Sequence, residues 1–248
     1  EISPALRAIA LTGKAELLLT EQKLDEALAT AAEAAQANPA YPWSYAVEAM
    51  AKIRKEDVDG AATAYEKAIE ADKYISSLYF DAAMLMAAVN KEDKAVAFLD
   101  RYALKKDDKY YVTYGNVLRS LQKYDEALAR YDEAIKENEV NAGAYVAKAA
   151  ILIHQEKYDE AEDALERAVA ANEFNPEAYV EKGNLLFAKK QYEAGVQEFA
   201  TALSQWKQAR ASQDQLVAVV QSVKQKLLNA RQREYASSWE REAMNLIR

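Results

Sequence analysis

The stretch QKYDEALARYDEAI at residues 122–135 is followed, 34 residues later, by EKYDEAEDALERAV at residues 156–169. The similarity extends beyond these two stretches, because a small residue recurs in steps of 34, 34, 32, 34 and 34 at Ala27, Ala61, Ala95, Ala127, Ala161 and Gly195. A fixed period of this length is typical of repeat proteins, in which each repeat buries its apolar face against its neighbours. The sequence therefore predicts a stack of six repeats.

Four further columns of residues keep this period and show what each repeat is. Sixteen residues before the small residue stand Leu11, Tyr45, Tyr79, Tyr111, Tyr145 and Tyr179, and twelve before it stand Ala15, Ala49, Ala83, Gly115, Ala149 and Gly183. Four after it stand Ala31, Tyr65, Leu99, Tyr131, Leu165 and Phe199, and seven after it stand Ala34, Ala68, Tyr102, Ala134, Ala168 and Ala202. Residues separated by three, four and seven positions share one face of a helix. Each repeat holds two such runs, so each is predicted to be a helical hairpin that crosses closely at its small residues.

This pattern closely resembles the tetratricopeptide repeat. The period, the order of large and small residues, the stretch NPEAY at 175–179 and the stretch YDEA at 124–127 and 158–161 carry the resemblance. The chain departs from the family pattern at Gly195, where Ala is usual, and at Tyr102, where a small residue is usual. The resemblance implies an all-α, right-handed superhelical solenoid of stacked hairpins, in which the first helix of each hairpin lines a concave groove.

The chain is predicted to consist of a repeat array at 1–205 and a helical cap at 206–248. The six repeats are expected at about 8–38, 42–72, 76–106, 108–138, 142–172 and 176–205. Beyond them, a helical stripe is formed by Leu216, Val219, Val220, Val223 and Leu227. Repeat arrays need a terminal element that covers the last apolar face. The stripe therefore predicts a C-terminal capping helix, which continues into a second helical stretch.

One step of the repeat is two residues short. It lies between Ala95 and Ala127, in the interval that holds Tyr102 and the connection Lys105-Lys106-Asp107-Asp108. The short step predicts a local irregularity between the third and fourth repeats. A change of pitch and a shortened loop without consequence are both open.

Composition restricts the classes of function. The 248 residues include no cysteine, so disulfides and thiolate metal sites are excluded, and no apolar run reaches the roughly 20 residues that span a bilayer. The net charge is −8, and because residues 204–248 carry +4, residues 1–203 carry −12. An acidic body repels phosphate backbones, which argues against a nucleic-acid partner. The chain begins at Glu1 without an initiator Met, so one expectation is that a signal peptide or leading segment has been removed. By resemblance we expect a soluble protein of the bacterial cytoplasm or periplasm.

Few residues suggest catalysis. His154 is the only histidine, and neither a P-loop nor a His-Glu-x-x-His motif is present. Paired acids such as Asp125/Glu126 and Asp159/Glu160 are expected at the start of the second helix of a repeat, where acids suit the helix dipole. The sequence therefore predicts no enzyme, no metal and no cofactor.

The first helices of several repeats carry a second apolar stripe. The second repeat holds Trp43, Val47, Met50 and Ile53, the third holds Phe80 and Met84, and the fifth holds Ile153. A helix that is apolar on nearly all sides is expected to be buried on nearly all sides. Three covers are open: a segment of another protein, the chain's own terminus, or the superhelix packing on itself.

The resemblance also offers a family site that can be tested. Some members grip a C-terminal carboxylate with a Lys/Asn/Arg clamp, and Asn116 and Asn184 stand at suitable asparagine positions. The positions for the basic residues hold Ala46, Phe80, Val112, Val146 and Val180 instead. A clamp of that kind is therefore not expected.

The preferred hypothesis is a non-enzymatic scaffold that binds a protein segment or peptide in its concave groove. The expected groove residues are Trp43, Val47, Met50, Ile53, Phe80, Met84, Asn116, Ile153 and Asn184. The alternative is a module that binds a small or lipidic ligand in an apolar pocket around Trp43, Met50, Phe80 and Met84. Association of the chain with further copies of itself is a third possibility for a partner.

Overall fold

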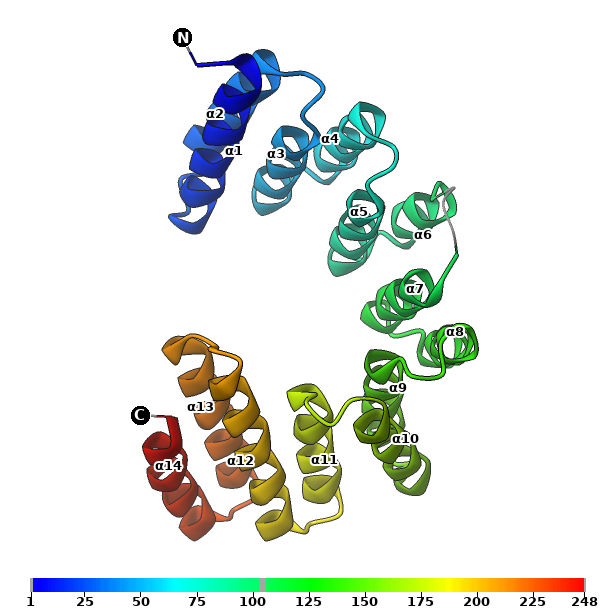
Figure 1. Cartoon of the computed structure of the whole chain (residues 1–248), viewed down its shortest axis with the longest axis vertical. Coiled ribbons are helices and arrows are strands. Elements are labelled where there is room, and N and C mark those ends of the chain that lie inside the picture. Colours follow the sequence, from blue (N-terminus) through cyan, green and yellow to red (C-terminus); the bar gives the residue numbers. More distant parts are fainter. Residues whose placement is uncertain (1, 103–105, 248) are drawn as a thin grey trace. The chain divides into compact units, whose positions relative to one another are not determined.

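The computed structural model describes residues 2–102 and 106–247, and the prediction of an all-α repeat fold is confirmed. Within those residues there are fourteen α-helices and no strand (Figure 1). They are α1 (Pro4–Thr20), α2 (Leu24–Ala37), α3 (Pro42–Arg54), α4 (Val58–Ala71), α5 (Ser76–Ala88), α6 (Glu92–Asp100), α7 (Asp108–Ser120), α8 (Tyr124–Glu137), α9 (Ala142–His154), α10 (Tyr158–Ala171), α11 (Pro176–Ala188), α12 (Tyr192–Gln208), α13 (Gln213–Asn229) and α14 (Arg233–Ile247). Helices α1 to α12 form six consecutive pairs that correspond to the six predicted repeats, and α13 and α14 form the tail.

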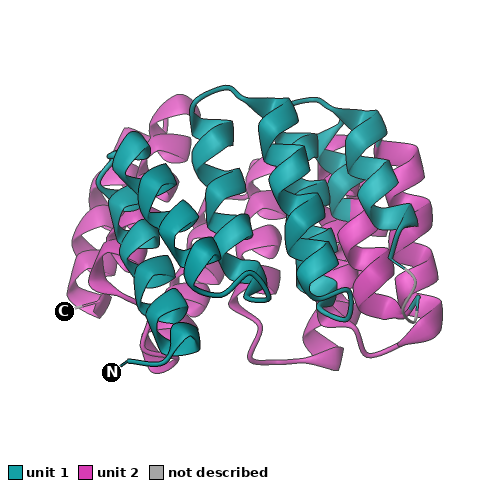
Figure 2. Cartoon of the chain, turned by 90° about the horizontal axis from the view of Figure 1, so that it is seen from above, with its two compact units in different colours: residues 1–106, 116–123 teal, residues 107–115, 124–248 magenta. Residues whose placement is uncertain are grey.

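The chain divides into two compact units (Figure 2). The first unit comprises residues 1–106 and 116–123, and the second comprises residues 107–115 and 124–248. The boundary runs through α7, so its N-terminal part belongs to the second unit and its C-terminal part to the first.

The small columns lie at the crossings inside the hairpins. Nine of these alanines are fully buried, with no exposed surface: Ala15, Ala27, Ala49, Ala61, Ala83, Ala95, Ala127, Ala149 and Ala161. The sixth repeat uses glycine at both crossing positions because an aromatic ring fills the space: a Cβ atom on Gly195 would lie 2.4 Å from Cδ1 of Phe187. The departure at Gly195 therefore follows from the size of Phe187.

The turn inside each hairpin uses a left-handed residue that is not glycine. Six such residues lie in the hairpin turns, with φ between 56° and 63°: Gln22, Glu56, Asn90, Gln122, Glu156 and Lys190. Arg210 and Arg231 adopt the same conformation in the turns before α13 and α14. The two amides that follow the first helix donate back to its last turn, as Glu156 does to Ile153 at 3.1 Å and Lys157 to Leu152 at 2.9 Å. These bonds satisfy carbonyls that the helix end leaves free, which offsets the steric cost of the left-handed conformation.

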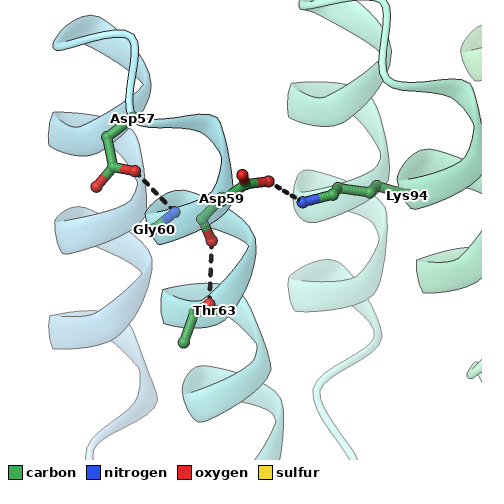
Figure 3. Close-up of polar contacts among 5 residues, drawn as sticks. All are labelled: Asp57, Asp59, Gly60, Thr63 and Lys94. Carbon is green, nitrogen blue, oxygen red and sulfur yellow. Dashed lines mark hydrogen bonds and ion pairs between the residues drawn. The ribbon is translucent and has the colours of Figure 1, made fainter.

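The acids near the start of the second helices cap those helices or form ion pairs with the next hairpin. Figure 3 shows the start of α4, where the Asp57 carboxylate accepts a hydrogen bond from the Gly60 amide at 2.9 Å and Asp59 pairs with Lys94 of the next hairpin. Similar links between successive hairpins join Asp25 to Lys55, Glu92 to Lys123 and Glu162 to Lys189. Exposed pairs of this kind each contribute about 0–1 kcal/mol. Helix capping and pairing thus account for these carboxylates.

The irregular step coincides with a short helix. α6 has 9 residues, whereas α2, α4, α8 and α10 each have 14. Tyr102 follows α6, and its ring packs on Tyr79 at 5.7 Å and on Phe80 at 5.1 Å between centroids. The predicted connection begins at residue 105, which lies outside the described residues.

The tail forms two helices that pack on the last repeat. Four members of the predicted stripe are buried with Phe199 and Leu203 of α12: Leu216, Val220, Val223 and Leu227. α14 closes this cluster with Trp239, whose indole Nε1 donates to the Val220 carbonyl at 2.9 Å. A capping box at Ser212 and Gln215 starts α13. Residues 213–247 therefore cover the apolar face of α12.

Candidate protein-binding surface

A pocket of about 470 Å³ lies on the first unit, and it brings together four of the predicted groove residues. Its walls come from α1, α3, α4 and α5, and its lining comprises Glu16, Trp43, Ala46, Val47, Met50, Tyr65, Asp81, Met84, Leu85 and Ala88. Trp43, Val47 and Met50 stand at i, i+4 and i+7 and so share one face of α3. Asp81, Met84 and Leu85 share the corresponding face of α5.

The pocket has a buried floor and an accessible rim. Val47 is only 1% exposed and packs on Leu18 and Ala31 in the core of the first hairpins. Trp43, Met50 and Met84 remain partly exposed. Sulfur and aromatic side chains make an adaptable apolar surface, since Met has three rotatable bonds and a polarisable sulfur. Val47 therefore supports the pocket from below, while Trp43, Met50 and Met84 present the surface that a partner would meet.

Two carboxylates interrupt this apolar lining. Glu16 of α1 and Asp81 of α5 are solvent-accessible, and neither has a hydrogen-bond or ion-pair partner within residues 2–102 and 106–247. Partial burial among the apolar side chains of the pocket raises the pKa of Asp81 above its ordinary value of 3.8. Tyr65 faces the same space; burial raises the pKa of its hydroxyl, and the charge of Asp81 adds to that effect. The pocket is thus apolar and electronegative at once.

The other expected groove residues do not line this pocket. Phe80 turns to Tyr102, as described above, and Ile53 is partly buried near the end of α3. Asn116 is partly buried on α7. In the second unit, Ile153 packs against the cluster around Leu152 and Leu165. The structure therefore assembles Trp43, Val47, Met50 and Met84, and it places the other five elsewhere.

Asn184 belongs to a polar network of the second unit. Its amide nitrogen donates to Glu181 at 3.1 Å, and its carbonyl oxygen accepts from the Lys226 ammonium of α13. The Lys226 nitrogen also lies 5.4 Å from the centroid of the Phe199 ring. Burial lowers the pKa of Lys226, and the charge of Glu181 opposes that shift. Asn184 therefore contributes to the seat of the cap.

The acidic residues of the pocket were not among the groove residues predicted from the sequence. Asp81 is the one charged residue of α5; at its repeat position Val47 and Ala147 are apolar, and Glu181 is acidic. A charge at that position within an otherwise apolar stripe was the available signal. Glu16 gave a weaker signal, because α1 carries charged residues at several positions.

Exposed apolar side chains at the turns between hairpins were also missed. Tyr74, Val140 and Phe174 are each between 66% and 69% exposed. In each case the backbone amide donates to an Asp or Asn side chain two residues earlier, at 2.9–3.2 Å. This local turn holds the apolar side chain away from the core.

The described residues show two further absences. They contain no cluster of three or more His, Cys, Asp or Glu side chains that is arranged to hold a metal ion. Along the same residues, 2–102 and 106–247, none of the helices has both the length and the apolar character needed to cross a membrane.

Comparison with known families agrees with the repeat pattern. The family model for "Tetratricopeptide repeat" matches residues 152–214, and the model for "Anaphase-promoting complex, cyclosome, subunit 3" matches residues 88–168. The chain is a tetratricopeptide repeat protein. No curated protein sequence matches this tetratricopeptide repeat chain significantly.

Solved structures share the fold over most of the chain. The structure of pilF from Pseudomonas aeruginosa is 13% identical, with a TM-score of 0.54 over 84% of this chain and 94% of the pilF chain. Yeast Tom70 is 17% identical, with a TM-score of 0.68 over 91% of this chain and 48% of the Tom70 chain. This tetratricopeptide repeat chain thus spans about half of Tom70. The TM-scores show a common fold and, at these low identities, the fold alone. Tetratricopeptide repeat proteins are generally scaffolds that bind protein partners, and they are typically not enzymes.

Proposed function

We propose that this chain is a scaffold that binds a segment of a partner protein on the surface formed by α1, α3 and α5. The observation that carries the proposal is the pocket of about 470 Å³, whose apolar lining comes from successive first helices. Trp43, Met50 and Met84 are the anchors, because they are partly exposed and converge on one space. Val47 holds them in place from below, whereas Ile53 and Phe80 lie outside the pocket.

The energetics favour anchoring by a few side chains. Binding energy in protein interfaces usually concentrates in a few buried aromatic or apolar residues surrounded by near-neutral contacts. A Trp side chain offers about 150–250 Å² for burial. Asn116, Ile153 and Asn184 are left out of this binding surface, since they lie outside the pocket and Asn184 is engaged with Glu181 and Lys226.

A small or lipidic ligand is the competing occupant. The pocket volume falls within the roughly 300–1,000 Å³ of small-molecule sites. A fatty acid, however, would bring its own carboxylate to a pocket that already holds Glu16 and Asp81. Like charges at close range disfavour binding, so a protein segment suits the pocket better.

The test is affinity purification with a matched control. The intact chain, the double variant Trp43→Ala/Met84→Ala and the control Tyr74→Ala are immobilised in parallel. Tyr74 is an exposed aromatic residue of the same unit that does not line the pocket. We expect a partner that is retained by the wild type and by Tyr74→Ala and lost from the double variant. Its direct binding is then measured with the purified partner.

Two measurements make the result decisive. Thermal melts must show that the double variant remains folded, because Met84 and Trp43 also contribute to packing. Retention of the partner by a folded double variant would overturn the proposal. Extraction of the purified wild-type chain with organic solvent, followed by mass spectrometry, would reveal a bound lipid and favour the competing occupant.

A further inference from the structure

Glu16 and Asp81 are the only charged side chains among the residues that line the pocket, and both are acidic. They come from α1 and α5, which lie on either side of α3 in the repeat order. A charge among apolar groups is costly to leave without a counter-ion. Partial burial raises the pKa of Asp81, which is consistent with that cost.

At the equivalent repeat position of the same chain, Glu181 is linked to a lysine through Asn184. Asp81 and Glu181 stand 100 residues apart, which equals three repeat steps of 32, 34 and 34. Glu181 accepts from Asn184, which in turn accepts from Lys226 of α13. The Lys226 ammonium lies beside the Phe199 ring and is linked to Glu181 through Asn184, and the charge of Glu181 raises the pKa of Lys226 against the effect of burial. Asp81 has no such basic neighbour in the described part of the chain.

The rest of the sequence also favours a basic partner. Residues 1–203 carry a net charge of −12, and the pocket lies within them. An acidic body raises the encounter rate with a basic partner and disfavours an acidic one.

From these observations we infer that the partner segment carries a lysine or arginine next to a large apolar residue. The apolar residue enters between Trp43, Met50 and Met84, and the basic group reaches Asp81 and Glu16. This inference rests on the proposed function, because it specifies the partner of the same pocket. It predicts the reverse of a clamp for an acidic C-terminus.

The experiment uses a displayed library of random peptides, so no natural partner is needed. Peptides are selected on the intact wild-type chain, with removal of those that also bind Trp43→Ala/Met84→Ala. The selected sequences are expected to be enriched in Lys or Arg adjacent to Leu, Ile, Met or Phe. Dissociation constants are then measured with Asp81→Asn and Glu16→Gln, which remove charge and preserve shape.

The control is Glu70→Gln, since Glu70 is an exposed acid of the same unit outside the pocket. We expect Asp81→Asn to weaken binding about tenfold, in line with the loss of a hydrogen bond to a charged group, and Glu70→Gln to leave it unchanged. Added salt should weaken wild-type binding more than binding by Asp81→Asn.

The outcomes separate the two proposals. Peptides that need Trp43 and Met84 but show no basic enrichment, or that bind Asp81→Asn as tightly as wild type, would overturn the inference and leave the proposed function standing. If selection yields no peptide that depends on Trp43 and Met84, the proposed function fails and this inference fails with it.

Discussion

Two helical glycines of this chain should respond in opposite directions to the same substitution. Gly13 lies in the middle of α1, and a Cβ atom there would meet nothing within 4 Å. Gly195 lies in the first turns of α12, where a Cβ atom would lie 2.4 Å from Phe187 and 3.1 Å from the carbonyl oxygen of Gly183. Replacement by Ala changes the chain by one methyl group in both cases.

The expected magnitudes follow from these distances. Ala in place of Gly inside a helix stabilises by about 0.5–1 kcal/mol, because Gly loses more backbone entropy on folding. At Gly13 this gain is unopposed. At Gly195 the methyl group forces the Phe187 ring to move and also meets backbone, and overpacking costs about 1–3 kcal/mol. The net effect of Gly195→Ala is therefore a loss of about 1–2 kcal/mol.

Thermal unfolding and amide exchange measure both effects. For a chain of this length, 1 kcal/mol shifts the melting temperature by roughly 2–4 °C. Gly13→Ala should raise it by about that amount, and Gly195→Ala should lower it by about 2–8 °C. Because repeat proteins can unfold in parts, faster amide exchange in α11 and α12 should accompany the change at Gly195. Shifts of the same sign in the two variants would refute the proposed packing of Phe187 against Gly195.

Three further changes test other parts of the structure. Leu185→Ala should destabilise the fold by about 2–4 kcal/mol, because Leu185 is 3% exposed. Leu17→Ala, at the equivalent repeat position but 59% exposed, should change stability by less than about 0.5 kcal/mol. An equal loss of stability in thermal melts of the two variants would show that α1 is covered in solution. Glu156→Gly should stabilise the folded state by a few tenths of a kcal/mol to about 1 kcal/mol, since Gly adopts φ of 60° without steric cost. Destabilisation measured by denaturant unfolding would contradict this expectation. Asp81→Asn should raise the melting temperature at pH 7, because the raised pKa of Asp81 means that its ionised form, facing Glu16 and Tyr65, disfavours folding. The difference in melting temperature from wild type should shrink as the pH falls through the raised pKa and below the ordinary value of 3.8. A difference that grows on acidification would oppose this account.

The architecture could be predicted from the sequence because its columns report local packing. Small residues such as Ala27 and Ala161 recur wherever two helices of a hairpin cross, and a column that holds over six repeats leaves little room for another fold. The same columns located the turns only approximately. The left-handed residues at those turns, such as Gln122 and Glu156, carry no glycine signal, since hydrogen bonds to the preceding helix stabilise them.

The candidate site was only partly predictable, for a related reason. Periodicity identifies the helix face on which a side chain lies, but it does not identify the residue against which that side chain packs. Phe80 lies in the expected stripe, yet it packs on Tyr102, because a large residue stands there in place of a small one. Met84, one turn further along α5, lines the pocket together with Trp43 and Met50.

The acidic residues of the pocket interrupt an otherwise apolar lining. Val47 at the equivalent position is apolar and buried, whereas Asp81 is exposed at the edge of the pocket. The chain places a carboxylate there, among side chains that raise its pKa and therefore at a cost to the folded state. At Glu181 the same substitution is balanced within the molecule by Asn184 and Lys226. No basic side chain of the described residues pairs with Asp81. A basic group from a partner is therefore the simplest means to offset the free-energy cost of its carboxylate, and that stabilisation would appear only on binding.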